Sequence, residues 1–301
     1  MADTAPGRER PLYASKAYAE AFGWPILDLV EWQTAVLKRP IHSTPWEDAL
    51  GCYPLGLIHR DADLAGGLER LRAAGMVSVS LVVDPVTGPG PEILSRAFSI
   101  CRPFKTHYLI DGAAGPARFS ATHRRWIRKA LRACEVTPVR LRDSLGEWER
   151  LYRNTVERHA IAGLQNFSPA YFAALADMPE VEAFCARAEG EIVAMALWVR
   201  SLEVTYYHLG ASDARGYEVQ AMYGIFAAAH EHFATTKVMH LGGAAGVTPN
   251  EDDGLARFKR GFANREVEAY FCGACLDPAR YAALTKDGAA SNSFFPAYRK
   301  P

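Results

Sequence analysis

The sequence predicts a mixed α/β fold, in which helices cover a mixed α+β sheet of parallel and antiparallel strands. Its second half shows one order of periodicities: helix, strand, helix, three strands in close succession, a long helix, strand, helix, strand. Antiparallel strands followed by a helical crossover to a further strand produce such a sheet. The stretch 111–116 (Asp-Gly-Ala-Ala-Gly-Pro) has the composition of a linker. We therefore expect two domains, residues 1–116 and 117–285, and a tail over 286–301.

The N-terminal third carries both helical and strand periodicity. Residues 63–74 place leucines at helical spacing, and Gly75 follows them as a helix end. Residues 77–83 alternate apolar side chains with serines, which is typical of a half-buried strand. The expected domain also contains helices at 17–22 and 92–99, strands at 26–32 and 107–110, and a short apolar run at 53–59.

The C-terminal two thirds shows sharper patterns. The helix expected over 121–134 is strongly amphipathic, with Trp126, Ala130 and Leu131 on its apolar side and a row of cations opposite. Glu189-Gly190 is expected to join two strands as a tight hairpin. The other expected elements are helices at 145–156, 217–234 and 255–261 and strands at 136–141, 181–188, 192–200, 204–209, 238–241 and 267–272.

Composition and charge exclude several classes of protein. The 301 residues carry 34 Lys+Arg and 34 Asp+Glu, and this net charge of zero argues against a protein that coats DNA through bulk charge. We expect no secretory signal and no membrane span, because no apolar stretch reaches the length of a membrane helix. The six scattered cysteines fit a reducing, cytoplasmic setting. No metal site is expected at Cys272 and Cys275, because a zinc site needs about four ligands.

Motifs of the C-terminal two thirds resemble one enzyme family. They are Tyr206-Tyr207-His208-Leu209-Gly210-Ala211, His240-Leu241-Gly242-Gly243, and Asp253-Gly254-Leu255 followed by Phe258-Lys259-Arg260-Gly261-Phe262. Together with the helix that contains His123-Arg124-Arg125-Trp126, they resemble the Fem-type aminoacyltransferases of the GCN5-related N-acetyltransferase (GNAT) superfamily. The resemblance implies tandem GNAT-like domains, of which the C-terminal one is complete. It also implies that strands 204–209 and 238–241 are parallel and splay apart around the acyl group.

The resemblance further implies an acyltransferase that moves an amino acid from aminoacyl-tRNA to an amine acceptor, in a peptidoglycan precursor or a natural-product peptide. The aminoacyl-tRNA is then a co-substrate, and no tightly bound cofactor is expected. Family members that bind CoA carry several glycines at the start of the long helix, because a phosphate cradle needs unobstructed backbone N–H groups. Here Arg215, Gly216 and Tyr217 supply a single glycine. Transfer from acetyl-CoA or another acyl-CoA, and a non-catalytic binding module, stay open as alternatives.

Site residues are implied by the same resemblance. Lys259 stands where the family's lysine handles the charged end of the tRNA or the negative charge of the oxyanion, although a solvated basic turn is the structural alternative. The strand end at Gly242 and Gly243 is expected to bind the acyl group. Lys38 and Arg39 are suggestions for the acceptor site in the N-terminal domain. The remaining residues expected at the donor or its acyl group are Arg215, Gly216, Tyr217, Phe258 and Arg260.

Three sets of side chains admit both a functional and a structural interpretation. His208 and His240 can accept the proton of the attacking ammonium, or they can be buried and hydrogen-bonded. Tyr206 and Tyr207 can line the acceptor or tRNA site, or they can pack in the core. The basic helix face can bind phosphates of tRNA or of the acceptor, or it can be a solvated helix face. Its cations are Arg124, Arg125, Arg128, Lys129 and Arg132.

Overall fold

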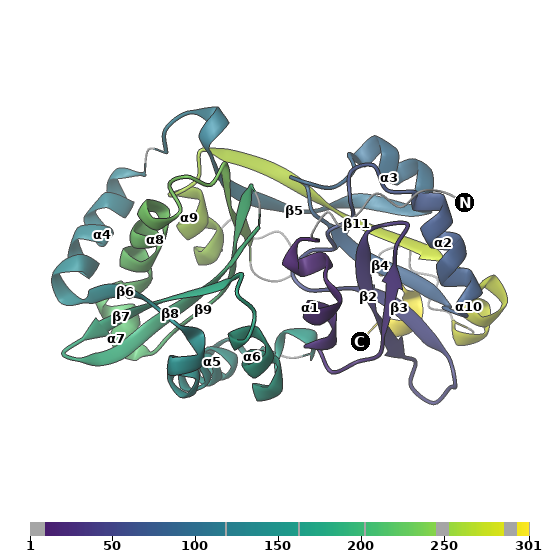
Figure 1. Ribbon diagram of the computed structural model, residues 1–301, viewed down its shortest axis with the longest axis horizontal. Helices are drawn as coiled ribbons and strands as arrows, with labels where there is room; N and C mark the ends of the chain where they lie inside the picture. Colours follow the sequence, from purple (N-terminus) through teal and green to yellow (C-terminus); the bar gives the residue numbers. More distant parts are fainter. Residues whose placement is uncertain are drawn as a thin grey trace. The chain divides into compact units, whose positions relative to one another are not determined.

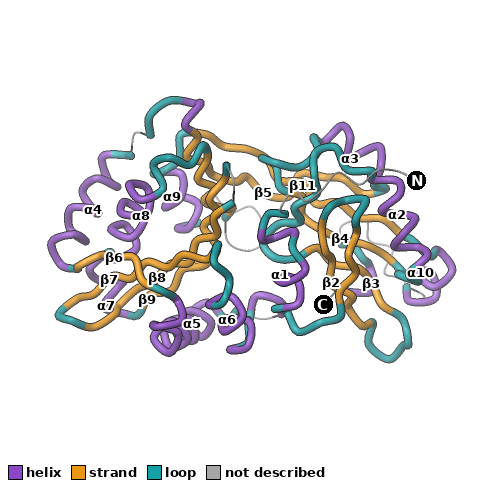
Figure 2. The backbone as a smooth tube through the Cα atoms, in the orientation of Figure 1, coloured by secondary structure: helices purple, strands orange, loops and turns teal. Residues whose placement is uncertain are grey.

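The computed structural model describes residues 10–117, 119–161, 163–201, 203–244, 253–285 and 294–300, apart from the side chain of Leu164. It has the mixed α+β architecture that the sequence predicts (Figures 1 and 2). The chain divides into two compact units, which are residues 1–103 with 270–301 (unit 1) and residues 104–269 (unit 2). Among the described residues, no helix is both long and apolar enough to cross a membrane.

Unit 1 builds its sheet from an antiparallel meander and one helical crossover. The meander strands are β1 (Ile26–Leu29), β2 (Thr34–Pro40) and β3 (Glu47–Gly51). The crossover helix α2 (Leu64–Ala73) leads to β4 (Ser78–Val83), which is parallel to β3 and antiparallel to β11 (Arg265–Cys275). The core surrounds Trp32, whose indole Nε1 donates to the carbonyl of Leu64 at 3.2 Å. The other helices are η1 (Leu12–Ala14), α1 (Lys16–Glu20), α3 (Pro91–Ala97), α10 (Pro278–Leu284) and η5 (Ala297–Arg299).

Unit 2 has a longer meander and again one helical crossover. Its antiparallel strands are β6 (Glu135–Val139), β7 (Val181–Ala188), β8 (Glu191–Arg200) and β9 (Val204–Ser212). Helices α7 (Ala214–Val219) and α8 (Ala221–His232) lead to β10 (Val238–Gly243), which is parallel to β9 and antiparallel to β5 (Ile100–Asp111). The other helices are η2 (Gly112–Ala114), α4 (Ala121–Ala133), η3 (Leu141–Ser144), α5 (Leu145–His159), η4 (Gly163–Gln165), α6 (Pro169–Ala176) and α9 (Gly254–Arg260).

Two helical layers bury the sheet of unit 2. Helices α4, α8 and α9 lie on one face and α5 and α6 on the other, as Figure 1 shows. The α8 side holds an aromatic core around Trp198, Phe226 and Phe262, all of them fully buried. Burial of such large side chains contributes roughly 2–3 kcal/mol each. This core fixes α9 against the strand ends that carry the candidate site.

The two units do not follow the boundaries expected from the linker. Strand neighbours run in the order β1-β2-β3-β4-β11-β5-β10-β9-β8-β7-β6, and both unit boundaries fall inside strands, one in β5 and one in β11. The second half of β11 pairs with β4, so residues 270–285 join unit 1. The second half of β5 pairs with β10, so residues 104–111 join unit 2. Of the expected tail, residues 286–293 lie outside the described residues.

Some element predictions were wrong for local reasons. The single helix expected over 217–234 is broken at Gln220, whose left-handed backbone (φ 62°) separates α7 from α8. The apolar run 53–59 forms only an isolated bridge at Gly56, and Pro54 in it has no N–H to donate to a ladder. Leu131, expected on the apolar side of α4, is 51% exposed.

Candidate active site

The parallel pair of β9 and β10 separates at its carboxyl ends. Paired positions run from Val204 opposite Val238 to Tyr206 opposite His240 and then stop. Both strands continue further, β9 to Ser212 and β10 to Gly243. β9 contains a β-bulge next to the last paired position, Tyr206. On β8, Trp198 pairs with Tyr207 and the adjacent Leu197 pairs with Leu209, so β9 has one extra residue between these pairs. The structure therefore confirms that the two strands are parallel and places their separation where the resemblance implies it.

Lys259 brings a buried amine to the end of β10. It lies in the last turn of α9, which begins at Asp253, where the side chain of Asp253 accepts from the backbone N–H of Leu255. The Lys259 side chain is almost fully buried; its Nζ donates to the carbonyl of Gly243 at 2.7 Å and lies 5.3 Å from the centroid of the Tyr207 ring. Burial lowers the pKa of Lys259 to about 7; the charge of Lys105 adds to this shift and Asp253 opposes it. Near neutral pH the amine can therefore both accept and donate a proton.

The glycines at the end of β10 allow this close approach. Gly242 has a left-handed backbone (φ +77°), and a Cβ there would lie 3.1 Å from the Nζ of Lys259. A Cβ on Gly243 would lie 2.8 Å from the His107 ring. The structure thus brings Gly242 and Gly243 together with Lys259, as the sequence predicts. The neighbouring segment 245–252 lies outside the described residues.

Two histidines, His107 and His240, lie next to the same end of β10. The backbone N–H of Gly242 donates to His240 Nδ1 at 3.2 Å, so the hydrogen of His240 is on Nε2 and points to His107 Nδ1, 3.2 Å away. Burial, the charge of His240, then those of Lys259 and Lys105 hold the pKa of His107 well below its usual value. Tyr206 packs against His240, with ring centroids 5.3 Å apart. His107 is therefore neutral near pH 7, and the two rings orient the backbone of the strand end.

Sequence reasoning missed two members of this cluster, Lys105 and His107. Both lie on β5, more than 130 residues from His240 along the chain, and reach it through the antiparallel pairing of β5 with β10. Lys105 Nζ donates to the carbonyl of Ala244 at 3.1 Å. No local motif marks either residue. The alternation of the predicted strand 107–110 identifies a strand but not its partner or its register.

His208 has a different environment from His240. Its Nε2 lies 2.9 Å from the Tyr171 hydroxyl on α6, and the side chain is buried. Burial lowers the pKa of His208 to about 3. A base this weak holds almost no proton at neutral pH, so the structural interpretation of His208 accounts for its contacts.

The start of α7 is occupied by a carboxylate. Asp213 caps this short helix, and its Oδ1 accepts from the backbone N–H of Gly216 at 2.9 Å. A Cβ on Gly216 would lie 2.3 Å from the carbonyl of Val193, so this glycine serves close packing. Arg215 forms ion pairs with Glu189 and Glu218 at 3.1 and 2.9 Å, and Tyr217 stacks under the Arg158 guanidinium. The Gly216 N–H and the Arg215 guanidinium, which could otherwise bind a pyrophosphate, are therefore bonded to carboxylates of the protein.

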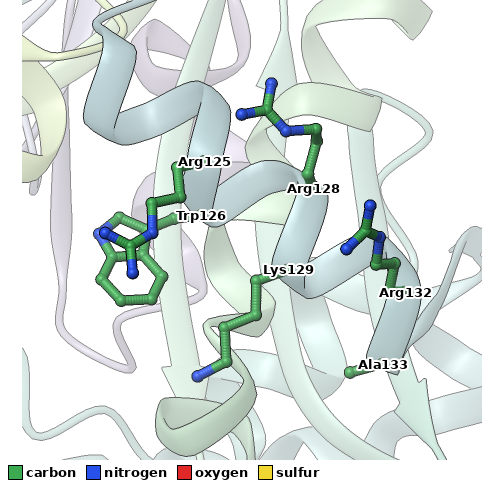
Figure 3. A pocket seen from close by; sticks show the side chains of 6 residues that line it. All are labelled: Arg125, Trp126, Arg128, Lys129, Arg132 and Ala133. Atoms are coloured by element: carbon green, nitrogen blue, oxygen red, sulfur yellow. The ribbon is translucent and has the colours of Figure 1, made fainter.

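The basic face of α4 borders a surface hollow. Figure 3 shows the side chains that line it, all from α4: Arg125, Trp126, Arg128, Lys129, Arg132 and Ala133. The Arg125 guanidinium and the Lys129 amine lie 5.3 and 5.4 Å from the centroid of the Trp126 ring. Within the part of the chain that the structure describes, none of the five cations of this face forms an ion pair with a carboxylate. Among the described residues, this face is therefore a positive surface whose cations have no carboxylate partner.

His123 connects this basic helix to the lysine helix α9. Its Nε2 lies 2.8 Å from the carbonyl of Phe258, and a Cβ on Gly261 would lie 1.9 Å from its ring. Phe258 packs on Phe226 with ring centroids 4.7 Å apart. Arg260 donates to the Tyr108 hydroxyl at 3.1 Å. Phe258 and Arg260 thus hold α9 in place, whereas Lys259 between them points to the strand end.

The acceptor residues suggested for the N-terminal domain form ion pairs within unit 1. Lys38 pairs with Glu47 at 2.8 Å, and Arg39 pairs with the buried Asp48 at 2.9 Å. Across the described segments, no three His, Cys, Asp or Glu side chains are grouped to hold a metal ion.

Comparisons with known proteins agree with this fold. Residues 118–260 match the family model described as an acetyltransferase (GNAT) domain. The structure is similar to that of FemX, with a TM-score of 0.65 and 14% identity over 90% of this chain and 94% of that chain. It is also similar to L-PGS from Bacillus licheniformis, with a TM-score of 0.57 and 13% identity over 92% of this chain and 96% of that chain.

A third solved structure has the same fold. It is the C-terminal domain of a putative lysylphosphatidylglycerol synthetase from Agrobacterium fabrum, with a TM-score of 0.55 and 18% identity over 84% of this chain and 83% of that chain. None of the curated proteins matches the sequence. The match over residues 118–260 and the shared fold support an acyltransferase with a GNAT-like fold.

Proposed function

We propose that the protein transfers an aminoacyl group from tRNA to an amine acceptor, in a peptidoglycan precursor or a natural-product peptide, and does so in the cytoplasm without a tightly bound cofactor. The observation that carries this proposal is the buried Lys259 amine at the point where β9 and β10 separate. Aminoacyl transfer needs a group that removes a proton from the acceptor ammonium and then stabilises the oxyanion. A lysine with a pKa of about 7 can do both.

The chemistry balances with Lys259 as the proton acceptor. The acceptor ammonium gives one proton to the Lys259 amine, and the resulting free amine attacks the ester carbonyl. The Lys259 ammonium then stands beside the oxyanion. As the new C–N bond forms and the ester C–O bond breaks, the departing ribose oxygen takes this proton from Lys259. The second proton of the attacking nitrogen goes to solvent.

The donor is inferred from charge at two places in unit 2. At the start of α7 the Asp213 carboxylate already bonds the Gly216 N–H, and a carboxylate there opposes the pyrophosphate of CoA. On α4, by contrast, the cations of the basic face have no carboxylate partners among the described residues. Such cations are available to neutralise the phosphates of a nucleic-acid backbone. His123 connects that surface to the helix of Lys259. These observations favour aminoacyl-tRNA over acyl-CoA.

Binding measurements test the donor directly. Filter binding with a pool of charged tRNAs should retain one charged species, and calorimetry with CoA and acetyl-CoA should show no binding. The variant Arg125→Glu/Arg128→Glu should weaken tRNA retention at least tenfold and reduce the salt slope by about two, because each lost phosphate contact removes about one. The matched control is Arg140→Glu/Arg153→Glu, which makes the same charge change on other exposed residues of unit 2. Micromolar CoA binding without tRNA retention would instead assign the protein to the acyl-CoA-dependent transferases.

A further inference from the structure

Two lysines, not one, hold the end of β10. Lys259 on α9 donates to the carbonyl of Gly243 at 2.7 Å, and Lys105 on β5 donates to the next carbonyl, that of Ala244, at 3.1 Å. The two amines therefore approach one strand end from separate elements. Two like charges so placed repel each other, and the repulsion is weakly screened where water is excluded.

The burial of the two amines decides which of them loses its proton. Lys259 is 5% exposed, whereas Lys105 is only partly buried and keeps access to water. The other titratable groups that face Lys259 are His107 on β5, Tyr207 on β9 and Asp253 at the start of α9. The lowered pKa of His107 keeps it neutral near pH 7, so Lys105 is the nearby cation and Asp253 the opposing anion. The deeper amine, Lys259, is the one that loses its proton more readily, because burial disfavours its ammonium form and the charge of Lys105 adds to that effect.

We propose that Lys105 is a positioning residue of the acyl-transfer site, whose ammonium group keeps Lys259 as a neutral amine able to accept the acceptor's proton. This inference rests on the proposed function for its catalytic consequence. Its electrostatic part does not depend on the identity of the donor. Lys105 then contributes to catalysis through Lys259, and its bond to Ala244 holds the strand end from the opposite side.

Direct titration of Lys259 tests the electrostatic step without any substrate. The protein is labelled with 13C and 15N at lysine, and the Lys259 side-chain resonance is assigned by its loss in Lys259→Met. In Lys105→Met the titration midpoint of Lys259 should rise by about one pH unit, because a neighbouring cation has been removed. In Lys105→Arg, which keeps the charge, it should stay within a few tenths of a unit. An unchanged midpoint in Lys105→Met would overturn the proposal.

Controls separate this effect from misfolding and from the choice of donor. Lys237→Met removes a surface lysine that pairs with Glu203 and should leave the Lys259 midpoint unchanged. If Lys105→Met does not fold, as judged by circular dichroism, Lys105→Gln keeps a donor for the Ala244 carbonyl without the charge. If the wild-type protein retains no charged tRNA, the proposed donor is wrong. The titration of Lys259 would still test the effect of Lys105.

The pH profile of transfer tests the catalytic consequence. In Lys105→Met the acidic limb of kcat/KM should move to higher pH by the same amount as the NMR midpoint, about one unit, so that the activity lost at pH 7 returns near pH 8. A merely structural role would lower kcat/KM equally at every pH. That uniform loss would contradict the positioning role.

Discussion

Unit 1 and unit 2 repeat one topological plan. In each, an antiparallel meander leads through a helical crossover to a strand that is parallel to the last meander strand, as β4 is to β3 and β10 is to β9. In each, that strand has a further antiparallel neighbour, β11 in unit 1 and β5 in unit 2. The plan itself is therefore not what makes an active site.

The units differ at the end of the parallel strand pair. In unit 1 the chain returns to β4, where the N–H of Gly56 donates to Val82 at 2.7 Å and Leu81 fills the space beside Gly51 and Gly56. In unit 2 the pairing of β9 with β10 stops at Tyr206 and His240, and the side chains of Lys259 and Lys105 donate to the carbonyls of Gly243 and Ala244 at the strand end. In unit 1, backbone and apolar side chains fill the end of the parallel strand pair. In unit 2, an amine lies at the same place.

Buried charges show the same contrast. Asp48 in unit 1 accepts from Arg39, from Arg299 at 2.9 Å and from the Tyr298 hydroxyl at 3.1 Å. Lys259 in unit 2 bonds a carbonyl and faces a ring, and no ion pair to it occurs among the described residues. A buried charge with a full set of partners stabilises the fold, whereas one without a counter-ion keeps its reactivity.

Replacement of Lys259 should have the greatest effect on activity. We expect Lys259→Met to lower kcat/KM for acyl transfer by 10²–10³, about 3–4 kcal/mol, because both the proton acceptor and the cation beside the oxyanion are lost. Single-turnover transfer with the donor identified by filter binding measures it. Lys237→Met should transfer at the wild-type rate. Near wild-type turnover in Lys259→Met would remove Lys259 from the mechanism.

The matching change in unit 1 should affect stability and leave chemistry intact. Asp48→Asn should lower the free energy of unfolding by about 3 kcal/mol, because it leaves two partly buried guanidinium groups without their carboxylate. Urea unfolding followed by circular dichroism measures this loss, and Asp61→Asn on the exposed surface is the control. Transfer by the folded variant should be unchanged. A loss of transfer that exceeds the loss of folded protein would assign unit 1 a direct part in catalysis.

The sequence predicted what local pattern and motif can specify. The meander and the crossover of unit 2 and the sheet class followed from periodicity, whereas β2 and β3 of unit 1 were not predicted. The resemblance named Lys259, Gly242 and Gly243 as parts of one site. Lys105 and His107 were not predicted as site residues. They reach the site through the register of β5 against β10, which no single stretch of sequence encodes. The expected domain boundaries differ from the units for a related reason, since β5 and β11 each contribute to both.

The smallest expected effect is the pH dependence of stability, and it sharpens the contrast between the two buried charges. Lys259 has a pKa of about 7 in the folded protein against its ordinary value of 10.5 in the unfolded chain. Below pH 7 both states hold the proton, so the full penalty of burying the ammonium opposes folding. Between pH 7 and 10.5 only the unfolded chain holds it, so stability rises with pH.

Lys259→Met removes the contribution of Lys259 to the pH dependence of stability and leaves the other titrating groups in place. The variant should therefore exceed the wild type in stability most at pH 7 and below. The gap should narrow by roughly 2 kcal/mol between pH 7 and pH 9. Urea unfolding of both proteins at pH 6, 7, 8 and 9 measures the gap, and for Lys237→Met the gap should not vary with pH. A constant gap for Lys259→Met would mean that Lys259 is fully charged in the folded protein at neutral pH. It would then act on the oxyanion alone, and the acceptor's proton would have to leave by another route.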